Sequence, residues 1–170
     1  RSAPMQRAVR QKPVAEILAE HYDYFSELAP QIEAMEKRYA QRKLATNAMD
    51  FDDLLVLWLK LLREHADVRE QYQRRFQFVL VDEYQDTNRL QAAILQGMKP
   101  DGRGVMVVGD DAQSIYSFRG ATVRNILDFP QQFAQPARVI TLDRNYRSTQ
   151  PILDASNAVI GAALERHAKT

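Results

Sequence analysis

Cysteine is absent from the 170-residue sequence. Its absence excludes disulfide bonds, cysteine-ligated zinc and thiol nucleophiles, and it fits a reducing cytoplasm, where we expect the protein to act. An excess of charge of one sign is also missing, because 23 Lys and Arg residues balance 22 Asp and Glu residues. With a net charge of +1, the chain is not a uniformly basic nucleic-acid binder, and any contact with nucleic acid must be local.

Long hydrophobic runs are missing too. The longest apolar run, residues 54–62, is interrupted by Lys60 and is far shorter than the roughly 20 residues that a membrane span requires. No secretory signal precedes it, so we expect no membrane association. The chain opens on Arg1 rather than Met, and its first 12 residues hold four basic side chains and no acidic one. We interpret this start as a truncated end rather than as a functional basic arm.

The first part of the chain has the apolar spacing of helices. Apolar residues recur every three or four positions from Val14 onward and resume after Pro30, which predicts two helices or one kinked helix. Asp50 is a suitable N-cap for a further helix, whose residues 54–62 are almost all apolar. We expect that helix to be buried on most sides. A short helix is predicted over residues 67–75.

The second part of the chain alternates strand and helix patterns. Three short runs rich in β-branched residues, 78–81, 105–108 and 138–142, each lead into a carboxylate, as is typical of buried parallel strands that end at a ligand site. Helical candidates at residues 88–98 and 122–129 lie between them. Strands that alternate with helices imply crossover connections. The predicted fold is therefore α/β, a parallel sheet preceded by an all-helical region.

The first strand delivers two adjacent carboxylates, Asp82 and Glu83, to its own end. Mg²⁺ bound to a nucleotide needs only one or two protein carboxylates, so Asp82 is a candidate ligand. Glu83 is then placed to orient or deprotonate an attacking water. The alternative is that both carboxylates cap the following helix, where the helix dipole favours negative charge.

A second candidate segment follows the second strand and combines an amide with aromatic and cationic side chains. An amide at a strand end is suited to contact a γ-phosphate or a water. Aromatic residues interleaved with arginine suit single-stranded nucleic acid, because every base offers a face for stacking. The alternative is that Ile115 and Phe118 form a core-facing pair of a short helix. The candidate residues are Gln113, Tyr116, Phe118 and Arg119.

A third candidate segment follows the third predicted strand. Arg147 is suited to act as an arginine finger on a transferring phosphoryl group, and Tyr146 to stack on a purine. The alternative is an ordinary solvated loop, because charged and hydroxyl residues at a turn are common there.

The three segments, in this order at successive strand ends, resemble motifs II, III and IV of the UvrD/Rep type of superfamily 1 helicases. The sequences that carry the resemblance are DEYQDTN at 82–88, QSIYSFRGA at 113–121 and NYRS at 145–148. Residues 50–55, DFDDLL, also resemble a stretch that lies upstream of motif II in that family. The resemblance covers about residues 49–160 and implies a partial P-loop NTPase sheet of the RecA-like type.

The resemblance implies an ATP site with Mg²⁺ as its metal. It gives Asp82 the role of metal ligand, Glu83 that of catalytic base and Gln113 that of a γ-phosphate sensor that links the phosphate to the DNA. It further implies that Tyr146 stacks on adenine and that Arg147 reaches the γ-phosphate from the second motor lobe.

The resemblance also implies a track for single-stranded DNA, lined by Tyr116, Phe118 and Arg119, along which the motor steps in the 3′ to 5′ direction. Phe118 is a departure, because the family often carries tryptophan at this position. Stacking remains available there, with a smaller ring area.

The sequence lacks the GxxxxGK[ST] loop that holds the phosphates in enzymes of this kind. Gly97 and Gly102 have the right separation, but Arg103 and Gly104 follow, so we interpret this segment as a turn. We therefore expect a fragment that binds ATP poorly and is inactive without the remainder of the helicase chain. Its expected parts are an inserted helical subdomain (1–75), later strands of the first motor lobe (76–135) and the start of the second lobe (136–170).

Two other functions remain open. A metal-dependent nuclease would also place carboxylates at strand ends, but it would need further acidic ligands, and the sequence has no Glu-x-Lys or Asp-x-Lys element. A non-catalytic, helicase-like DNA-binding or partner subunit that lacks the phosphate loop would show the same motifs. A phosphate loop upstream of Arg1 would distinguish the motor from this second alternative.

Overall fold

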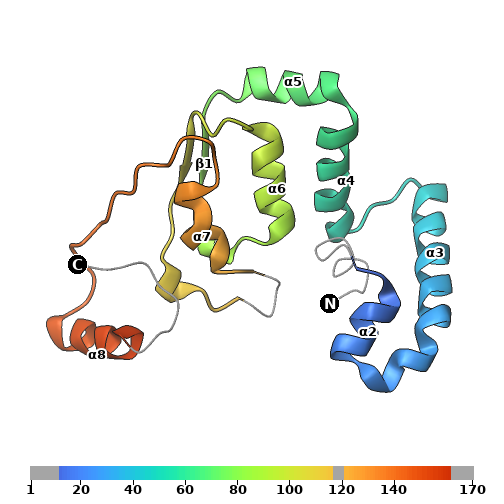
Figure 1. The fold of residues 1–170 in the computed structure, drawn as a ribbon, viewed down its shortest axis with the longest axis horizontal. Helices are drawn as coiled ribbons and strands as arrows, with labels where there is room; N and C mark the ends of the chain where they lie inside the picture. Colours follow the sequence, from blue (N-terminus) through green and yellow to red (C-terminus); the bar gives the residue numbers. More distant parts are fainter. Residues whose placement is uncertain (1–11, 117–120, 162–170) are drawn as a thin grey trace. The chain divides into compact units, whose positions relative to one another are not determined.

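The computed structural model describes residues 12–116 and 121–161 (Figure 1), and the chain divides into two compact units. Arg1–Gln77 and Asn88–Pro100 form the first unit, which is helical in its described part. Phe78–Thr87 and Asp101–Thr170 form the second unit, which holds the sheet.

The helices of the first unit follow the predicted pattern. Val14, Leu18 and Ala29 are buried together in a small core, on which Ile32 also packs. The predicted break is confirmed, because a short 3-10 helix separates the first two α-helices and Pro30 occupies the first turn of the second, where its missing N–H costs nothing. The elements are α2 (Val14–His21), η1 (Asp23–Leu28), α3 (Ala29–Ala45), α4 (Phe51–Glu64), α5 (Ala66–Arg75) and α6 (Arg89–Met98).

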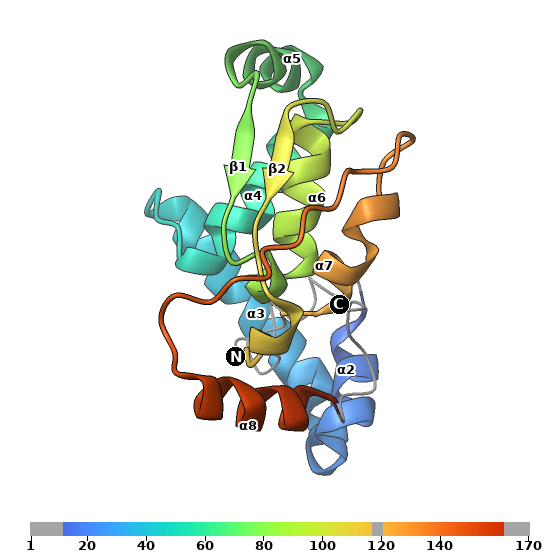
Figure 2. The same ribbon diagram turned by 90° about the vertical axis from the view of Figure 1, so that its left-hand side faces the viewer.

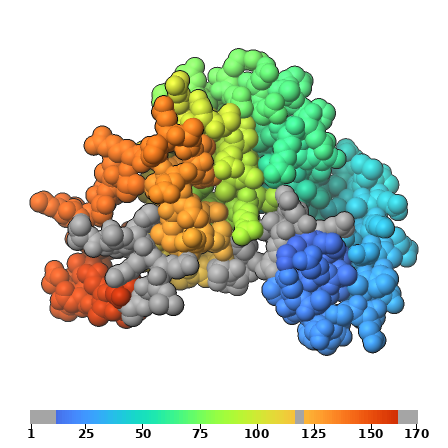
Figure 3. Space-filling model, in the orientation of Figure 1, coloured from blue at the N-terminus to red at the C-terminus, as the bar shows by residue number. Residues whose placement is uncertain are grey.

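Helix α4 packs against α6 and α5 within the first unit, and its side chains, in green, meet those of α6 in the space-filling view (Figure 3). Gly97 of α6 favours this approach, since a Cβ there would lie 3.4 Å from Leu62 Cδ1. Leu59 and Leu62 are buried, but Phe51 is 89% exposed and Leu54 is 49% exposed. The prediction that α4 is buried on most sides is therefore wrong, because its two packing partners cover only part of its apolar surface.

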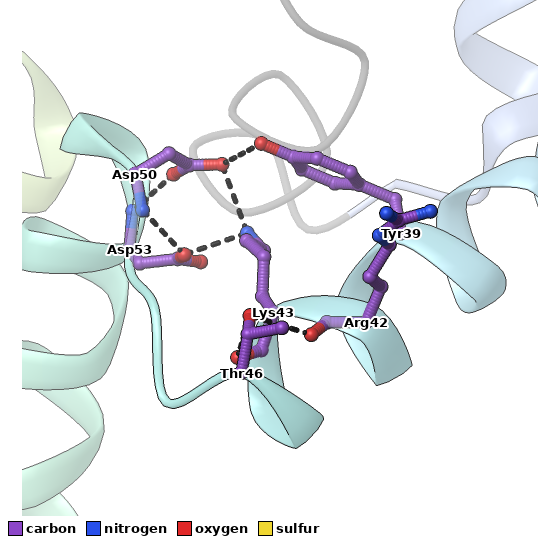
Figure 4. A network of polar contacts seen from close by, with 6 residues as sticks. All are labelled: Tyr39, Arg42, Lys43, Thr46, Asp50 and Asp53. Atoms are coloured by element: carbon purple, nitrogen blue, oxygen red, sulfur yellow. Dashed lines mark hydrogen bonds and ion pairs between the residues drawn. The ribbon is translucent and has the colours of Figure 1, made fainter.

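The junction between α3 and α4 is held by polar contacts (Figure 4). The Asp50 carboxylate accepts a hydrogen bond from the backbone N–H of Asp53 at 2.9 Å, and the Asp53 carboxylate accepts one from the backbone N–H of Asp50, also at 2.9 Å. This capping box confirms Asp50 as the N-cap of α4. Lys43 of α3 contacts both carboxylates, at 2.9 Å and 2.6 Å, and Tyr39 donates its hydroxyl to Asp50 at 3.1 Å. The end of one helix is thereby tied to the start of the next.

The junction should make stability depend on pH. The hydrogen bond from Lys43, with smaller contributions from the N–H of Asp53 and the hydroxyl of Tyr39, lowers the pKa of Asp50 to about 2. An unfolded aspartate titrates at about 3.9, so Asp50 contributes stability above about pH 4 that is lost as the pH falls towards 2. We predict that Asp50→Asn removes part of this pH dependence. Urea denaturation of both proteins across this range measures their free energies of unfolding. A difference between the wild type and the variant that does not change with pH would contradict the prediction.

The second unit contains a two-stranded parallel sheet in which β1 (Val79–Val81) lies beside β2 (Val105–Val107) (Figure 2). Val79 pairs with Val105 and Val81 with Val107. Both strands fall where apolar β-branched runs predict them. The other elements of this unit are η2 (Tyr84–Asp86), η3 (Asp111–Gln113), α7 (Arg124–Asp128), η5 (Phe129–Gln131) and α8 (Gln150–Gly161).

One face of this sheet is apolar and exposed. Leu80 and Met106 are direct neighbours in the register, and they are 69% and 52% exposed. Parallel sheets are normally covered on both faces by packed elements. In the described part of the chain, this face has no such cover.

The third predicted strand, residues 138–142, is not formed, and this part of the prediction is wrong. The segment has no regular secondary structure, and Val139, Ile140 and Leu142 are 62%, 69% and 87% exposed. An apolar, β-branched run becomes a strand only when a neighbouring strand takes its backbone hydrogen bonds. The described sheet consists of β1 and β2, and neither pairs with residues 138–142. Asp143 consequently does not end a strand.

The segment with phosphate-loop spacing is a turn, as predicted. Gly97 lies within α6, whereas Gly102 and Gly104 adopt φ values of +72° and +73° in the turn that leads into β2. These two positions use the left-handed conformation that favours glycine. A phosphate loop follows a strand and opens a helix, so this segment does not form one.

Candidate nucleotide site at the ends of the parallel strands

The ends of β1 and β2 lie side by side. Val108 donates its backbone N–H to the carbonyl of Val81 at 2.8 Å, and Tyr84 donates in return to the carbonyl of Val108 at 3.0 Å. The chain segments that follow the two strands therefore leave the sheet at the same edge. In α/β sheets, this edge is where ligands bind.

Asp82 and Glu83 stand at this edge with both side chains exposed. Asp82 accepts the backbone N–H of Glu83 at 2.9 Å. Glu83 itself adopts φ 50° and ψ 43°, a left-handed conformation that is rare for a residue with a side chain and that concentrates at functional sites. The helix-capping alternative finds no side-chain bond to support it: Glu83 is the N-cap residue of η2 but makes no side-chain cap hydrogen bond there, and α6 is capped by Asn88 through a capping box with Gln91.

Gln85 is a residue of this site that sequence reasoning missed. Its side chain is 1% exposed and lies between the two strand ends. Its amide nitrogen donates to Glu83 Oε2 at 2.7 Å, and its amide oxygen accepts the backbone N–H of Asp110 at 3.1 Å. A glutamine in a run of polar residues looks like a loop residue, and the only available signal is its place two residues after the glutamate.

The segment after β2 is folded tightly around Asp110. One oxygen of this carboxylate accepts the N–H of Ala112 at 3.1 Å, and the other accepts the side-chain amide of Gln113 at 3.1 Å. Gln113 is exposed at the end of η3, and Tyr116 is half-buried three residues further on. The structure thus places Gln113 on a segment that is bonded to Gln85. The predicted DNA contacts Phe118 and Arg119 lie outside the described residues.

The third predicted segment forms a local turn. Asn145 Oδ1 accepts the backbone N–H groups of Arg147 at 2.8 Å and of Ser148 at 2.9 Å. Tyr146 is 89% exposed and Arg147 is exposed as well. Within the described ranges, 12–116 and 121–161, the structure does not bond these side chains to the residues at the strand ends.

The turn that carries the carboxylates rests on a packed support. Tyr84 is 1% exposed, and its ring meets that of Phe129 edge-on at a centroid distance of 5.3 Å. Burial raises the pKa of the Tyr84 hydroxyl. Asn125 of α7 donates its amide to the carbonyl of Thr87 at 3.0 Å and to the Thr87 hydroxyl at 3.1 Å. The two ends of the short helix η2 are therefore fixed to η5 and to α7, respectively.

The donor set fits a magnesium ion that is carried by a nucleotide. Asp82 offers an exposed carboxylate, and Mg²⁺ usually takes one or two protein carboxylates besides phosphate oxygens and waters. Among the described residues, no group of three or more His, Asp or Glu side chains is placed to hold a metal by itself.

Two carboxylates and an amide at the end of a small parallel sheet define an α/β protein with a candidate nucleotide site. Residues 4–134 match the UvrD/REP helicase N-terminal domain, and the chain belongs to this family. No helix in the described ranges has the length and apolarity that crossing a membrane would take.

Curated relatives agree with this assignment. The chain is 43% identical over 151 residues to the ATP-dependent DNA helicase UvrD1 of Mycobacterium tuberculosis and of Mycobacterium bovis, which covers 84% of the chain and 19% of each relative. It is 45% identical over 130 residues to the ATP-dependent DNA helicase PcrA of Staphylococcus aureus, which covers 76% of the chain and 18% of the relative. The chain thus spans about a fifth of the length of these relatives.

Proposed function

We propose that this chain is part of an ATP-dependent DNA helicase that moves along single-stranded DNA in the 3′ to 5′ direction. The observation that carries the proposal is the exposed Asp82 and Glu83 pair at the end of β1, held beside the end of β2. The names of the UvrD1 and PcrA relatives support an ATP-driven reaction on DNA. The direction and the single-stranded track are those that the family resemblance implies.

In this proposal, the residues at the strand ends work on the γ-phosphate of ATP. Asp82 binds the Mg²⁺ ion, which supplies charge neutralisation on the phosphates when it is bound. Glu83 accepts a proton from the attacking water, and Gln113 contacts the γ-phosphate. Tyr146 stacks on the adenine and Arg147 reaches the γ-phosphate once the second lobe closes. Tyr116, with Phe118 and Arg119, contacts the DNA.

The rest of the site is proposed to come from other parts of a longer protein. The exposed apolar face at Leu80 and Met106 supports this view, since a parallel sheet is normally covered on both faces. We assign residues 1–75 to the inserted helical subdomain, 76–135 to the first motor lobe and 136–170 to the start of the second. Without a phosphate loop, we expect the 170-residue chain alone to be inactive.

Steady-state ATP hydrolysis by the full-length protein, with and without a single-stranded oligonucleotide, tests the proposal. We expect hydrolysis to rise severalfold with DNA, and the protein to unwind a duplex with a 3′ tail faster than one with a 5′ tail. A non-catalytic partner subunit would instead bind DNA without hydrolysing ATP. That outcome would reject the motor function for this protein.

A further inference from the structure

The side chain of Gln85 joins the two strand ends through both atoms of its amide. The nitrogen donates to Glu83 Oε2 at 2.7 Å, and the oxygen accepts the N–H of Asp110 at 3.1 Å. An amide has one donor end and one acceptor end, and here each end has the partner that suits it. With 1% exposure, the side chain is shielded from bulk solvent, so these two bonds determine its orientation.

The surroundings leave Gln85 little freedom to move. A Cβ at position 109 would lie 2.3 Å from Gln85 Oε1, so the absence of a side chain at Gly109 is what allows the amide to approach β2. The backbone carbonyl of Gln85 accepts the hydroxyl of Ser114 at 3.4 Å. Gln85 therefore contacts the segment after β2 at both ends of η3 (Asp111–Gln113).

Glu83 gains from this arrangement what a general base requires. Its side chain is exposed, and its two carboxylate oxygens would otherwise sample many orientations. A base works only if its oxygen stays within hydrogen-bond reach of the proton that it abstracts. The bond from Gln85 restrains one oxygen, Oε2, and leaves the other, Oε1, for the water.

We propose that Gln85 is a positioning residue that couples the Glu83 carboxylate to segment 109–116, so that DNA contact at Tyr116 aligns the base. This inference rests on the proposed helicase function. A shift of Asp110 changes the bond to Gln85 Oε1, and the rigid amide passes this change to Glu83 Oε2. By linkage, a nucleotide that changes the position of Glu83 also changes the affinity of the segment for DNA.

The test uses Gln85→Leu and Gln85→Glu in the full-length protein. Both keep the buried volume, but leucine removes both bonds, whereas an ionised glutamate can accept from Asp110 and cannot donate to Glu83. We expect both to lower kcat at saturating DNA by roughly 10- to 100-fold, as misplaced catalytic groups do, with KM for ATP little changed. We also expect the ratio of DNA-stimulated to DNA-free hydrolysis to fall. Gln131→Leu, at an exposed glutamine, is the matched control.

The outcomes separate the inference from the function that it rests on. If Gln85→Leu keeps the kcat and the stimulation ratio of the wild type, the inference is overturned and the helicase function stands. An equal loss of stimulated and DNA-free rates, together with a lower melting temperature, shows a merely structural role and also overturns it. If Gln85→Leu does not fold, Gln85→Glu decides alone. Absence of DNA-stimulated hydrolysis in the wild type rejects the function, and the inference falls with it.

Discussion

Replacing Glu83 with glutamine is expected to lower the kcat of DNA-stimulated ATP hydrolysis by about 10²- to 10⁴-fold, the usual contribution of a general base. The amide has nearly the same shape as the carboxylate but cannot take a proton from water. Its oxygen can still accept the bond from Gln85, which is 2.7 Å long in the structure. The variant therefore changes the chemistry of the site and preserves its geometry.

Titration with a fluorescent ATP analogue should show nearly unchanged nucleotide binding in Glu83→Gln, because phosphate affinity resides in the phosphate loop. Glu70→Gln serves as a control, since Glu70 is an exposed glutamate whose contact is an i,i+4 ion pair with Arg74. We expect its kcat to stay within about twofold of the wild type, as for most surface substitutions. Turnover by Glu83→Gln at the rate of this control would disprove the assigned role of Glu83.

Truncation of Tyr84 to alanine is expected to destabilise the site by about 3–5 kcal/mol, as for other buried aromatic residues. Its ring is 1% exposed and packs edge-on against Phe129. Tyr84→Phe keeps the ring and loses only a long contact of 3.5 Å from the hydroxyl to Gln132. We expect this variant to cost about 1 kcal/mol or less.

Amide hydrogen exchange measures this difference within the full-length protein. The N–H groups of Val108 and Tyr84 bond across the strand ends, at 2.8 Å and 3.0 Å, and they report opening of this region. Protection of both amides should fall strongly in Tyr84→Ala and little in Tyr84→Phe. Equal protection in the two variants would mean that the ring does not support the turn.

Local signals explain the parts of the fold that the sequence predicts correctly. Asp50 with Asp53, and Asn88 with Gln91, place cap residues three apart, and both pairs form capping boxes. Apolar β-branched runs predict β1 and β2, and their parallel pairing brings Asp82 next to the segment after β2. In each case, the deciding contacts lie within a few residues or within one strand pair.

The failed predictions depend on neighbours that the sequence pattern does not reveal. Residues 138–142 have the composition of a strand, yet no described strand pairs with them. Helix α4 has apolar residues on most sides, but packing against α5 and α6 leaves Leu54 49% exposed. The role of Gln85 depends on bonds between segments 25 residues apart, from position 85 to position 110, and no periodicity encodes such a contact.

The most direct test of the proposed nucleotide site is a structure of the full-length protein with Mg²⁺ and a non-hydrolysable ATP analogue. We predict that Asp82 contacts the ion directly or through one of its waters. We also predict that Glu83 lies about 2.6–3.2 Å from a water in line with the γ-phosphate. A nucleotide bound away from the end of β1, with Asp82 and Glu83 facing only solvent, would contradict both predictions.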